Sequence, residues 1–246
     1  MKQLKVFKIG GKLIDDNVAL NDFLQKFSEV EGPKILVHGG GNIASDFGEK
    51  LGIVPNMHEG RRITNDETID LVTMIYAGLV NKKMVAKLQE KEVDAIGLSG
   101  ADGNCVLSEK RPVKEIDYGW VGDVKMVDDI FLMQLIEVGK TPVLCALTHD
   151  GKGNILNTNA DTMASEIASA MSQHFEVLLD YNFEKRGVLL DVEDENSVVL
   201  EIDKKYYQEL KNAGKIHSGM IPKLDNCFDA IAKGVSEVRI GETRIV

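Results

Sequence analysis

The sequence predicts an α/β fold with an open, mainly parallel sheet that is flanked by helices on both faces. Short apolar runs alternate along the chain with segments of helical spacing, and two of these runs end in clusters of glycine. The chain of 246 residues is long enough to bury a substantial core without disulfide or metal support. Ligands of such sheets bind where the strands end, so we expect the functional residues at that edge.

The expected elements follow from the periodicity of apolar residues and from turn residues at their ends. Strands are predicted at residues 4–9, 34–38, 95–98, 142–146, 177–180 and 238–240. Helices are predicted at residues 13–27, 42–51, 130–138 and 161–171, and a long one is expected to open at the Thr-x-x-Glu capping box of residues 64–67.

Two regions of the chain are expected to form hairpins or loops. Residues 100–123 are rich in glycine, aspartate and charge, which indicates a hairpin or loop over the sheet, and residues 188–190 are expected to pair with 198–201. Without a low-complexity linker, we expect two tightly packed lobes, an N-terminal lobe of residues 1–174 and a C-terminal lobe of residues 175–246.

The composition excludes several classes of function. A formal net charge of −10 argues against nonspecific nucleic-acid binding, which depends on neutralisation of phosphates by Lys and Arg. No apolar run is long enough to cross a bilayer, and the first residues enter a strand pattern without a signal sequence, so we expect a cytoplasmic protein without a membrane role. The cysteines, Cys105, Cys145 and Cys227, are widely spaced and are interpreted as reduced packing residues.

Two glycine turns are candidate anion-binding sites. Lys8 ends the first predicted strand immediately before Gly10 and Gly11, whose bare N–H groups can approach phosphate oxygens. Residues 39–41, three glycines, follow the second strand at the start of a helix, where the helix dipole favours an anion. A surface lysine beside a tight turn and a purely structural glycine cluster are the alternatives. His38 is interpreted as a packed or hydrogen-bonding residue, because no partner ligand lies at a metal-binding spacing.

Common nucleotide-binding signatures are absent. The Gly-Lys-Thr of residues 139–141 lacks the leading glycine of a P-loop and precedes a strand, and no Gly-x-Gly-x-x-Gly follows the first strand. This argues against a P-loop ATPase and against an NAD-dependent dehydrogenase.

Six separated motifs resemble, in their order, those of the acetylglutamate kinases of the amino-acid kinase superfamily. They are Lys-Ile-Gly-Gly at 8–11, Val-His-Gly-Gly-Gly at 37–41, Gly-Arg-Arg-Ile-Thr at 60–64, Gly-Leu-Ser-Gly-Ala-Asp-Gly at 97–103, Asn-Thr-Asn-Ala-Asp at 157–161 and Gly-Met-Ile-Pro-Lys at 219–223. The resemblance covers nearly the whole chain. It implies a three-layer sandwich that transfers the γ-phosphoryl group of ATP to the side-chain carboxylate of N-acetyl-L-glutamate or N-succinyl-L-glutamate, in arginine biosynthesis.

The resemblance also implies roles for individual residues. Lys8 and Lys223 would contact the transferring phosphoryl group, and Asp161 would hold both lysines by ion pairs. The backbone donors would be Gly10, Gly11, Gly40 and Gly41. Arg62 would bind the α-carboxylate of the substrate and Asn157 the same amino-acid moiety, unless Arg62 instead forms a salt bridge with Glu59. The N-terminal lobe would bind acylglutamate and dimerise, whereas the C-terminal lobe would bind ATP, and Mg²⁺ would enter with the ATP phosphates.

The sequence departs from the family pattern in three places. Arg61 stands where a leucine-like residue is usual, which suggests either an extra carboxylate on the acyl group or a solvent-facing arginine. The turn at residues 180–187 is longer than the family's, and Asp180 is a candidate nucleotide-binding residue there. Arginine-inhibited members carry an additional N-terminal helix that links dimers into hexamers; this sequence begins at its first strand, so we expect a homodimer insensitive to arginine.

Two other functions compete with this interpretation. Another carboxylate or carbamate kinase of the superfamily would share Lys8 and the glycine turns but would lack the pair Arg62 and Asn157. A noncatalytic sensor of amino acids or nucleotides would not need Lys8, Asp161 and Lys223, and their retention argues against it.

Overall fold

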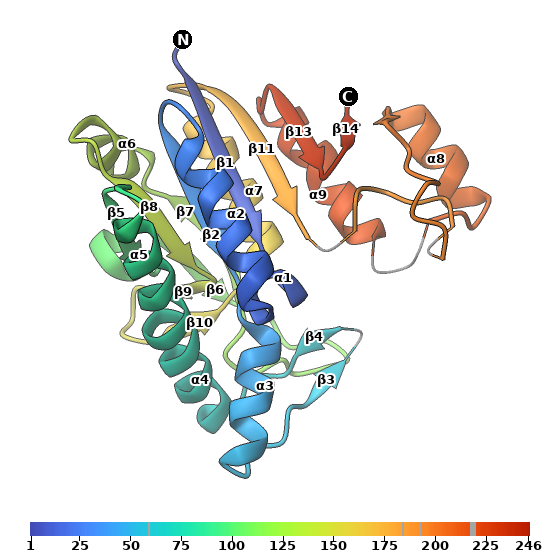
Figure 1. Ribbon diagram of the computed structural model, residues 1–246. Helices are drawn as coiled ribbons and strands as arrows, with labels where there is room; N and C mark the ends of the chain where they lie inside the picture. The colour runs from blue at the N-terminus through green and yellow to red at the C-terminus, as the bar shows by residue number, and fades with distance from the viewer. Residues whose placement is uncertain (59, 184, 192, 217–219) are drawn as a thin grey trace.

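The main sheet of the computed structural model is mainly parallel, as predicted. The structure describes residues 1–246 except 59, 184, 192 and 217–219. In spatial order the strands are β12 (Glu201–Ile202), β14 (Thr243–Ile245), β13 (Glu237–Ile240), β11 (Glu176–Asn182), β1 (Gln3–Ile9), β2 (Lys34–His38), β8 (Thr141–Cys145) and β5 (Ala95–Leu98). Only the pairing of β13 with β14 is antiparallel among the described strands of this sheet. Figure 1 shows the strands running side by side through the molecule.

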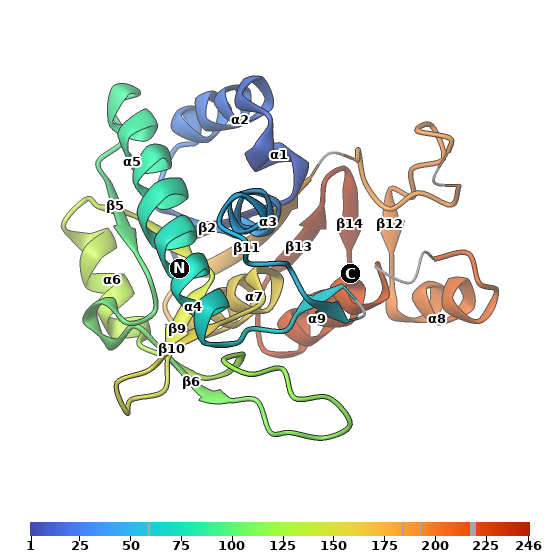
Figure 2. The same ribbon diagram turned by 90° about the horizontal axis from the view of Figure 1, so that it is seen from below.

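Helices cover both faces of the sheet, which confirms the predicted fold class (Figure 2). One face is covered by α1 (Lys12–Asp15), α2 (Asn17–Glu29), α3 (Gly41–Lys50) and a long helix made of α4 (Asp66–Val72), the π-helix η1 (Thr73–Val80) and α5 (Asn81–Glu90). The other face is covered by α6 (Asp129–Glu137), α7 (Ala160–Met171) and α9 (Ile221–Ala232), and α8 (Lys204–Asn212) packs beside α9.

The alternation of side chains along β1 assigns each residue to one face. Leu4 and Val6 are fully buried in the core beneath α7 and α9, whereas Phe7 and Ile9 are buried in the core beneath α2 and α5. Because alternate residues of a strand point to the same face, Lys8 belongs to the face of Leu4 and Val6. Its side chain is thereby directed toward α7 and α9.

Two smaller sheets are also present, and the two-stranded one lies in the lower part of the molecule in Figure 1. The four-stranded sheet contains β10 (Ile155–Asn157), β9 (Leu147–His149), β6 (Val106–Lys110) and β7 (Gly122–Val127), in that order. A hairpin is formed by β3 (Met57–His58) and β4 (Arg61–Arg62), and a short 3₁₀ helix, η2 (Asp102–Asn104), precedes β6. Residues 100–123, expected to form a hairpin or loop, contain η2 and β6, and β6 pairs antiparallel with β7, which begins at Gly122 and continues past that range.

Several local predictions are corrected. Asp16 interrupts the helix expected over residues 13–27, because its carboxylate accepts hydrogen bonds from the N–H groups of Val18 and Ala19 and caps α2. The predicted capping box at residues 64–67 is wrong: Asn65 caps α4, and the Thr64 hydroxyl instead donates to the Arg62 carbonyl.

The C-terminal strands also differ from expectation. The hairpin expected between residues 188–190 and 198–201 is reduced to a bridge of Leu189 with Val198, and the next residues form β12, which pairs with β14. β14 itself was not predicted; it follows Gly241, whose φ of 56° allows the tight return from β13.

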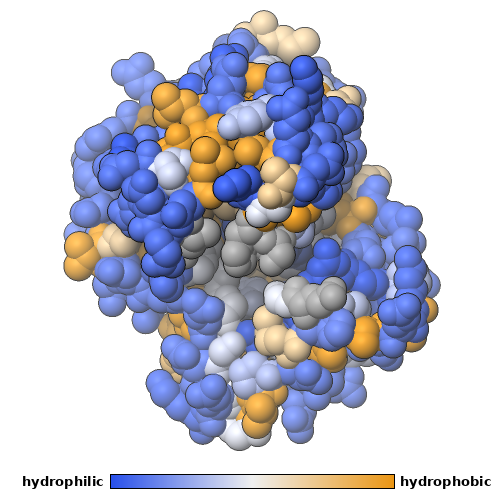
Figure 3. All heavy atoms as spheres, turned by 90° about the vertical axis from the view of Figure 1, so that its right-hand side faces the viewer, coloured by the Kyte–Doolittle hydropathy of each residue, from blue (hydrophilic) through white to orange (hydrophobic). Residues whose placement is uncertain are grey.

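The structure also bears on what the composition predicts about membrane-spanning segments and cysteines. Among the described residues, no helix is both long and apolar enough to cross a membrane. Figure 3 shows a largely hydrophilic face on which apolar side chains gather in the upper part. Exposed apolar side chains of the C-terminal segment are Leu190, Leu200 and Val246. The cysteines are free and buried, as expected of packing residues.

Candidate active site

The two glycine turns lie side by side at the carboxyl edge of the main sheet. β1 and β2 are neighbours, with Ile9 opposite His38, so the turns that follow them are adjacent. Gly40 is the N-cap residue of α3, and the first N–H groups of that helix therefore point toward the same edge. Gly11 has a φ of 56°, a conformation that favours glycine. The turns form an N–H-rich surface suited to an anion.

Lys8 and Lys223 converge on one carboxylate. The Nζ atom of Lys8 lies 2.6 Å from Oδ1 of Asp161, and Nζ of Lys223 lies 3.6 Å from Oδ2. Burial alone would raise the pKa of Asp161, but the charges of both lysines outweigh it and hold this pKa below its ordinary value. The carboxyl group is therefore ionised at neutral pH, and the cluster carries one net positive charge.

Neighbouring groups fix the positions of these three side chains. Asn159 caps α7 by accepting from the N–H groups of Asp161 and Thr162, and the Tyr181 hydroxyl donates to the carbonyl of Asp161 at 3.1 Å. A Cβ atom on Gly10 would come within 2.8 Å of Nζ of Lys8, so glycine leaves room for the ammonium group. The Gly219 of the sequence motif lies outside the described residues.

Lys223 has a second contact. Its Nζ atom lies 5.2 Å from the centre of the Phe183 ring, a cation–π distance. Phe183 belongs to the turn at residues 180–187, where the sequence departs from the family pattern. The side chain of Lys223 is thus held between the carboxylate of Asp161 and an aromatic ring.

A cavity of about 340 Å³ adjoins this cluster. It is lined by Gly11, Gly39, Gly40, Gly41, Met57, Gly60, Arg61, Arg62, Tyr76, Arg111, Val121, Ala146, Asn157, Thr158, Asn159, Ala160 and Thr162. The N-termini of α3 and α7 both contribute, since Gly41 and Ala160 begin these helices. Three arginines and two helix N-termini favour a ligand with more than one negative charge.

Arg62 is anchored on one side of the cavity. Its NH2 group donates to the carbonyl of Gly41 at 2.8 Å and to the hydroxyl of Ser45 at 2.7 Å. A guanidinium carries further donors in a planar fork, which is suited to a carboxylate. The alternative pairing of Arg62 with Glu59 falls on a residue outside the described part of the chain. On the cavity wall, the amide of Asn157 donates to the Thr64 hydroxyl at 3.1 Å.

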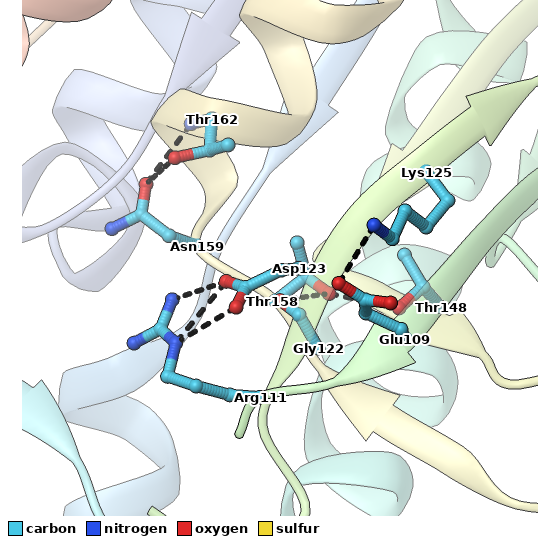
Figure 4. A network of polar contacts seen from close by, with 9 residues as sticks. All are labelled: Glu109, Arg111, Gly122, Asp123, Lys125, Thr148, Thr158, Asn159 and Thr162. Atoms are coloured by element: carbon cyan, nitrogen blue, oxygen red, sulfur yellow. Dashed lines mark hydrogen bonds and ion pairs between the residues drawn. The ribbon is translucent and has the colours of Figure 1, made fainter. Parts of the chain in front are cut away.

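Arg111 was not predicted from the sequence. It enters the cavity from the end of the β6–β7 hairpin, and its guanidinium bonds Asp123 through both Nε and NH2 (Figure 4). An isolated arginine outside the family motifs carries no sequence signal of a ligand-binding role, because only the folding of the β6–β7 hairpin brings Arg111 to the cavity. Asp123 neutralises much of its charge.

His38 is a buried hydrogen-bonding residue, as interpreted from the sequence. Its Nδ1 lies 2.7 Å from the Gly39 carbonyl, and the amide of Asn81 lies 3.0 Å from its Nε2. Burial lowers the pKa of His38 to about 4, so the ring is neutral at pH 7, with Nδ1 donating and Nε2 accepting. The second hydrogen of the Asn81 amide goes to the carbonyl of Val143, which ties the glycine turn to the sheet.

Asp180 and Arg61 are the remaining predicted site residues, and of the two only Arg61 lines the cavity. Asp180 lies on β11 opposite Phe7 and Arg239, and it does not line the described cavity. Burial raises the pKa of Asp180 to about 6, against the smaller opposing effect of Arg239. Arg61 is exposed but lines the cavity. Among the described residues, no group of three or more His, Cys, Asp or Glu side chains could hold a metal ion.

Comparison with known proteins decides the family. The amino acid kinase family matches residues 3–242. The chain belongs to this family. The resemblance to acetylglutamate kinases is confirmed by relatives of that name, from Cytophaga hutchinsonii with 54% identity over 98% of this chain and 91% of the relative, and from Bacteroides fragilis with 53% identity over 97% and 92%. A crystal structure from Streptococcus mutans shares the amino acid kinase fold, with a TM-score of 0.80, 27% identity and coverage of 99% of this chain and 98% of that one.

Proposed function

We propose that the protein is an ATP-dependent kinase that phosphorylates the side-chain carboxylate of N-acetyl-L-glutamate, a step of arginine biosynthesis. The observation that carries the proposal is the convergence of Lys8 and Lys223 on Asp161, next to a cavity with arginines and N–H-rich turns. The names of the relatives supply the substrate. A noncatalytic sensor would have no use for two ammonium groups held on one carboxylate.

The chemistry requires no general base. A side-chain carboxylate is ionised at neutral pH, so one of its oxygens can attack the γ-phosphorus while the bond from phosphorus to the ADP oxygen breaks. Negative charge spreads over the transferring group, and phosphoryl transfer depends mainly on positioning and on stabilisation of that charge. Lys8 and Lys223 supply the cations, and Gly10, Gly11, Gly40 and Gly41 are proposed to supply backbone donors. Asp161 would hold the ammonium groups in place without accepting a proton.

The cavity beside this cluster is proposed to bind the acylglutamate. Arg62 would bind the α-carboxylate with the donors that Gly41 and Ser45 leave free. Asn157, which also lines the cavity, would bind the same amino-acid moiety. The acceptor carboxylate would then point toward Lys8, because Ala160 lines the cavity immediately before Asp161.

The test is a comparison of two lysine variants. Wild-type protein should release ADP and form a hydroxylamine-trappable acyl phosphate with ATP, Mg²⁺ and N-acetyl-L-glutamate. Lys8→Met should lower kcat by about 100-fold or more, since one such donor contributes about 3 kcal/mol to the transition state. Lys12→Met, an exposed lysine at the same turn, is the matched control and should stay near wild type. Activity with unmodified glutamate alone would overturn the substrate assignment.

A second candidate substrate is N-succinyl-L-glutamate. It is favoured by Arg61 and Arg111, which line the cavity in addition to Arg62 and could face a third carboxylate. Arg111 already pairs with Asp123, so Arg61 carries most of this argument. Comparison of kcat/KM for the acetyl and succinyl substrates decides between them, and Arg61→Leu should impair only the succinyl substrate. A strong preference of the wild type for the acetyl substrate would remove this candidate.

We also propose how the metal ion, the two lobes and the subunits of this kinase are arranged, and where in the cell it acts. Mg²⁺ would be held by ATP phosphates and water, and residues 1–174 and 175–246 would bind acylglutamate and ATP respectively, with Asp180 near the nucleotide. The resemblance supports a homodimer, which light scattering tests. Buried free thiols favour a reducing compartment, in support of a cytoplasmic location.

A further inference from the structure

The long helix that borders the cavity contains an unusual segment. Between α4 and α5, residues Thr73–Val80 form a π-helix. Such widened turns are rare, because they sacrifice the favoured i→i+4 geometry, and they occur often at functional sites. None of the sequence motifs of the family resemblance includes this segment.

The π-helix brings two residues to the same glycine turn. In a π-helix hydrogen bonds join residues five apart, so side chains five positions apart lie near one face, whereas in an α-helix they diverge. Tyr76 and Asn81 have this spacing. Asn81 bonds His38, which precedes the turn, and the ring of Tyr76 lies against Gly40, where a Cβ atom would be 2.9 Å from the ring. Both side chains are buried.

The hydroxyl of Tyr76 reaches the substrate cavity beside Arg62. Tyr76 lines the cavity, and its oxygen would lie 3.9 Å from a Cβ atom on Gly41. Burial raises the pKa of Tyr76, and the positive charge of Arg62 opposes that rise. A phenol hydroxyl can donate one hydrogen bond and also accept. Among the described residues no acceptor takes the proton of the Tyr76 hydroxyl.

We propose that Tyr76 is a further substrate-binding residue, whose hydroxyl donates to the carboxylate that Arg62 binds. This inference rests on the proposed function. A carboxylate has about four lone-pair sites, so a guanidinium and a neighbouring phenol can bind it together. The ring holds Gly40 against the cavity, and the π-helix is the feature that directs both Tyr76 and Asn81 to the turn.

The test is the removal of the hydroxyl alone. Tyr76→Phe keeps the ring on Gly40, and we expect KM for N-acetyl-L-glutamate to rise about ten-fold or more, the loss expected for a hydrogen bond to a charged group. kcat and KM for ATP should remain near wild type. Tyr207→Phe is the matched control: it removes another buried tyrosine's hydroxyl, bonded to Asp225 at 2.7 Å, and should leave KM for N-acetyl-L-glutamate unchanged.

A substrate analogue separates binding from positioning. With the α-carboxamide of N-acetylglutamate, the penalty of Tyr76→Phe should shrink, because the neutral amide gains less from the hydroxyl. An equal penalty for both compounds would mean that Tyr76 only positions Arg62 and would overturn the inference. A KM within two-fold of wild type, in a variant with an unchanged melting temperature, would also overturn it. A wild type that does not phosphorylate N-acetyl-L-glutamate would instead overturn the proposed function and this inference with it.

If Tyr76→Phe fails to fold, binding of N-acetyl-L-glutamate to the wild type supplies the readout. Formation of a hydrogen bond from the Tyr76 hydroxyl to bound N-acetyl-L-glutamate should shift the ultraviolet difference spectrum of tyrosine during a titration with this ligand. Tyr207→Phe should retain this shift, and its absence from both proteins would refute the proposed contact.

Discussion

Replacing Asp161 with asparagine tests the charge cluster directly. Asp161→Asn preserves shape but leaves the ammonium groups of Lys8 and Lys223 without a counter-charge. At the Lys8–Asp161 separation of 2.6 Å, opposite unit charges attract by about 6 kcal/mol with an effective dielectric constant of about 20. Desolvation offsets part of this, so we expect a loss of about 3–5 kcal/mol, as for other buried pairs that lose one partner.

The loss should appear in both stability and rate. A loss of that size lowers the melting temperature by about 10 °C in a protein of this length. Because the pKa of Asp161 is lowered in the folded state, its stabilisation is present above the carboxyl pKa of the unfolded chain, about 4, and disappears as pH falls. The stability difference between wild type and Asp161→Asn should therefore be greatest near pH 7 and shrink toward pH 3. We expect kcat to fall by about 100-fold as the lysines move.

Nucleotide binding gives this prediction a sharper readout. The phosphates of ATP would replace the missing negative charge, so Mg²⁺-ATP should raise the melting temperature of Asp161→Asn more than that of the wild type. Thermal melts with and without Mg²⁺-ATP and steady-state ADP release measure these effects. Asp22→Asn, on the exposed face of α2, is the control. Wild-type kcat and melting temperature in Asp161→Asn would refute the reasoning.

Three further substitutions test other parts of the site. Asp180→Asn should be more stable than the wild type by up to about 3 kcal/mol at pH 8, but not at pH 3. Burial raises the pKa of Asp180 to about 6, so the wild type loses stability as pH rises through that value. Urea unfolding across this pH range measures the effect, and identical pH profiles for the two proteins would contradict it. Gly40→Ala would place its Cβ atom 2.9 Å from the ring of Tyr76, so KM for N-acetyl-L-glutamate should rise and the free energy of unfolding should fall by about 1–3 kcal/mol. Adding Tyr76→Leu relieves the overlap and should recover stability, but not KM, because the Tyr76 hydroxyl is lost. Phe183→Leu should remove a cation–π contact with Lys223 worth about 0.5–2 kcal/mol and lower kcat several-fold. Phe183→Trp keeps an aromatic ring and should retain activity. Equal kcat values in the two variants would exclude a role of the ring in positioning Lys223.

Local pattern was sufficient for much of the fold. The alternation of Leu4, Val6 and Lys8 reports the strand and also the face on which Lys8 lies, because side-chain direction in a strand depends only on parity. Apolar periodicity likewise located most of the sheet strands. The errors occurred where neighbouring polar groups compete to cap a helix, as with Asn65 and Thr64, since tertiary contacts decide which side chain is free to cap.

The sequence by itself determined the sheet, its glycine turns and the candidate cations, because these follow from short-range periodicity and from motifs in a recognisable order. Only the tertiary structure decided which distant residues meet. The β6–β7 hairpin positions Arg111 at the cavity, and a π-helix positions Tyr76 there. The apolar periodicity of the sequence does not predict that π-helix. Encounters of this kind depend on packing between segments far apart in the chain, and no local repeat of the sequence encodes them.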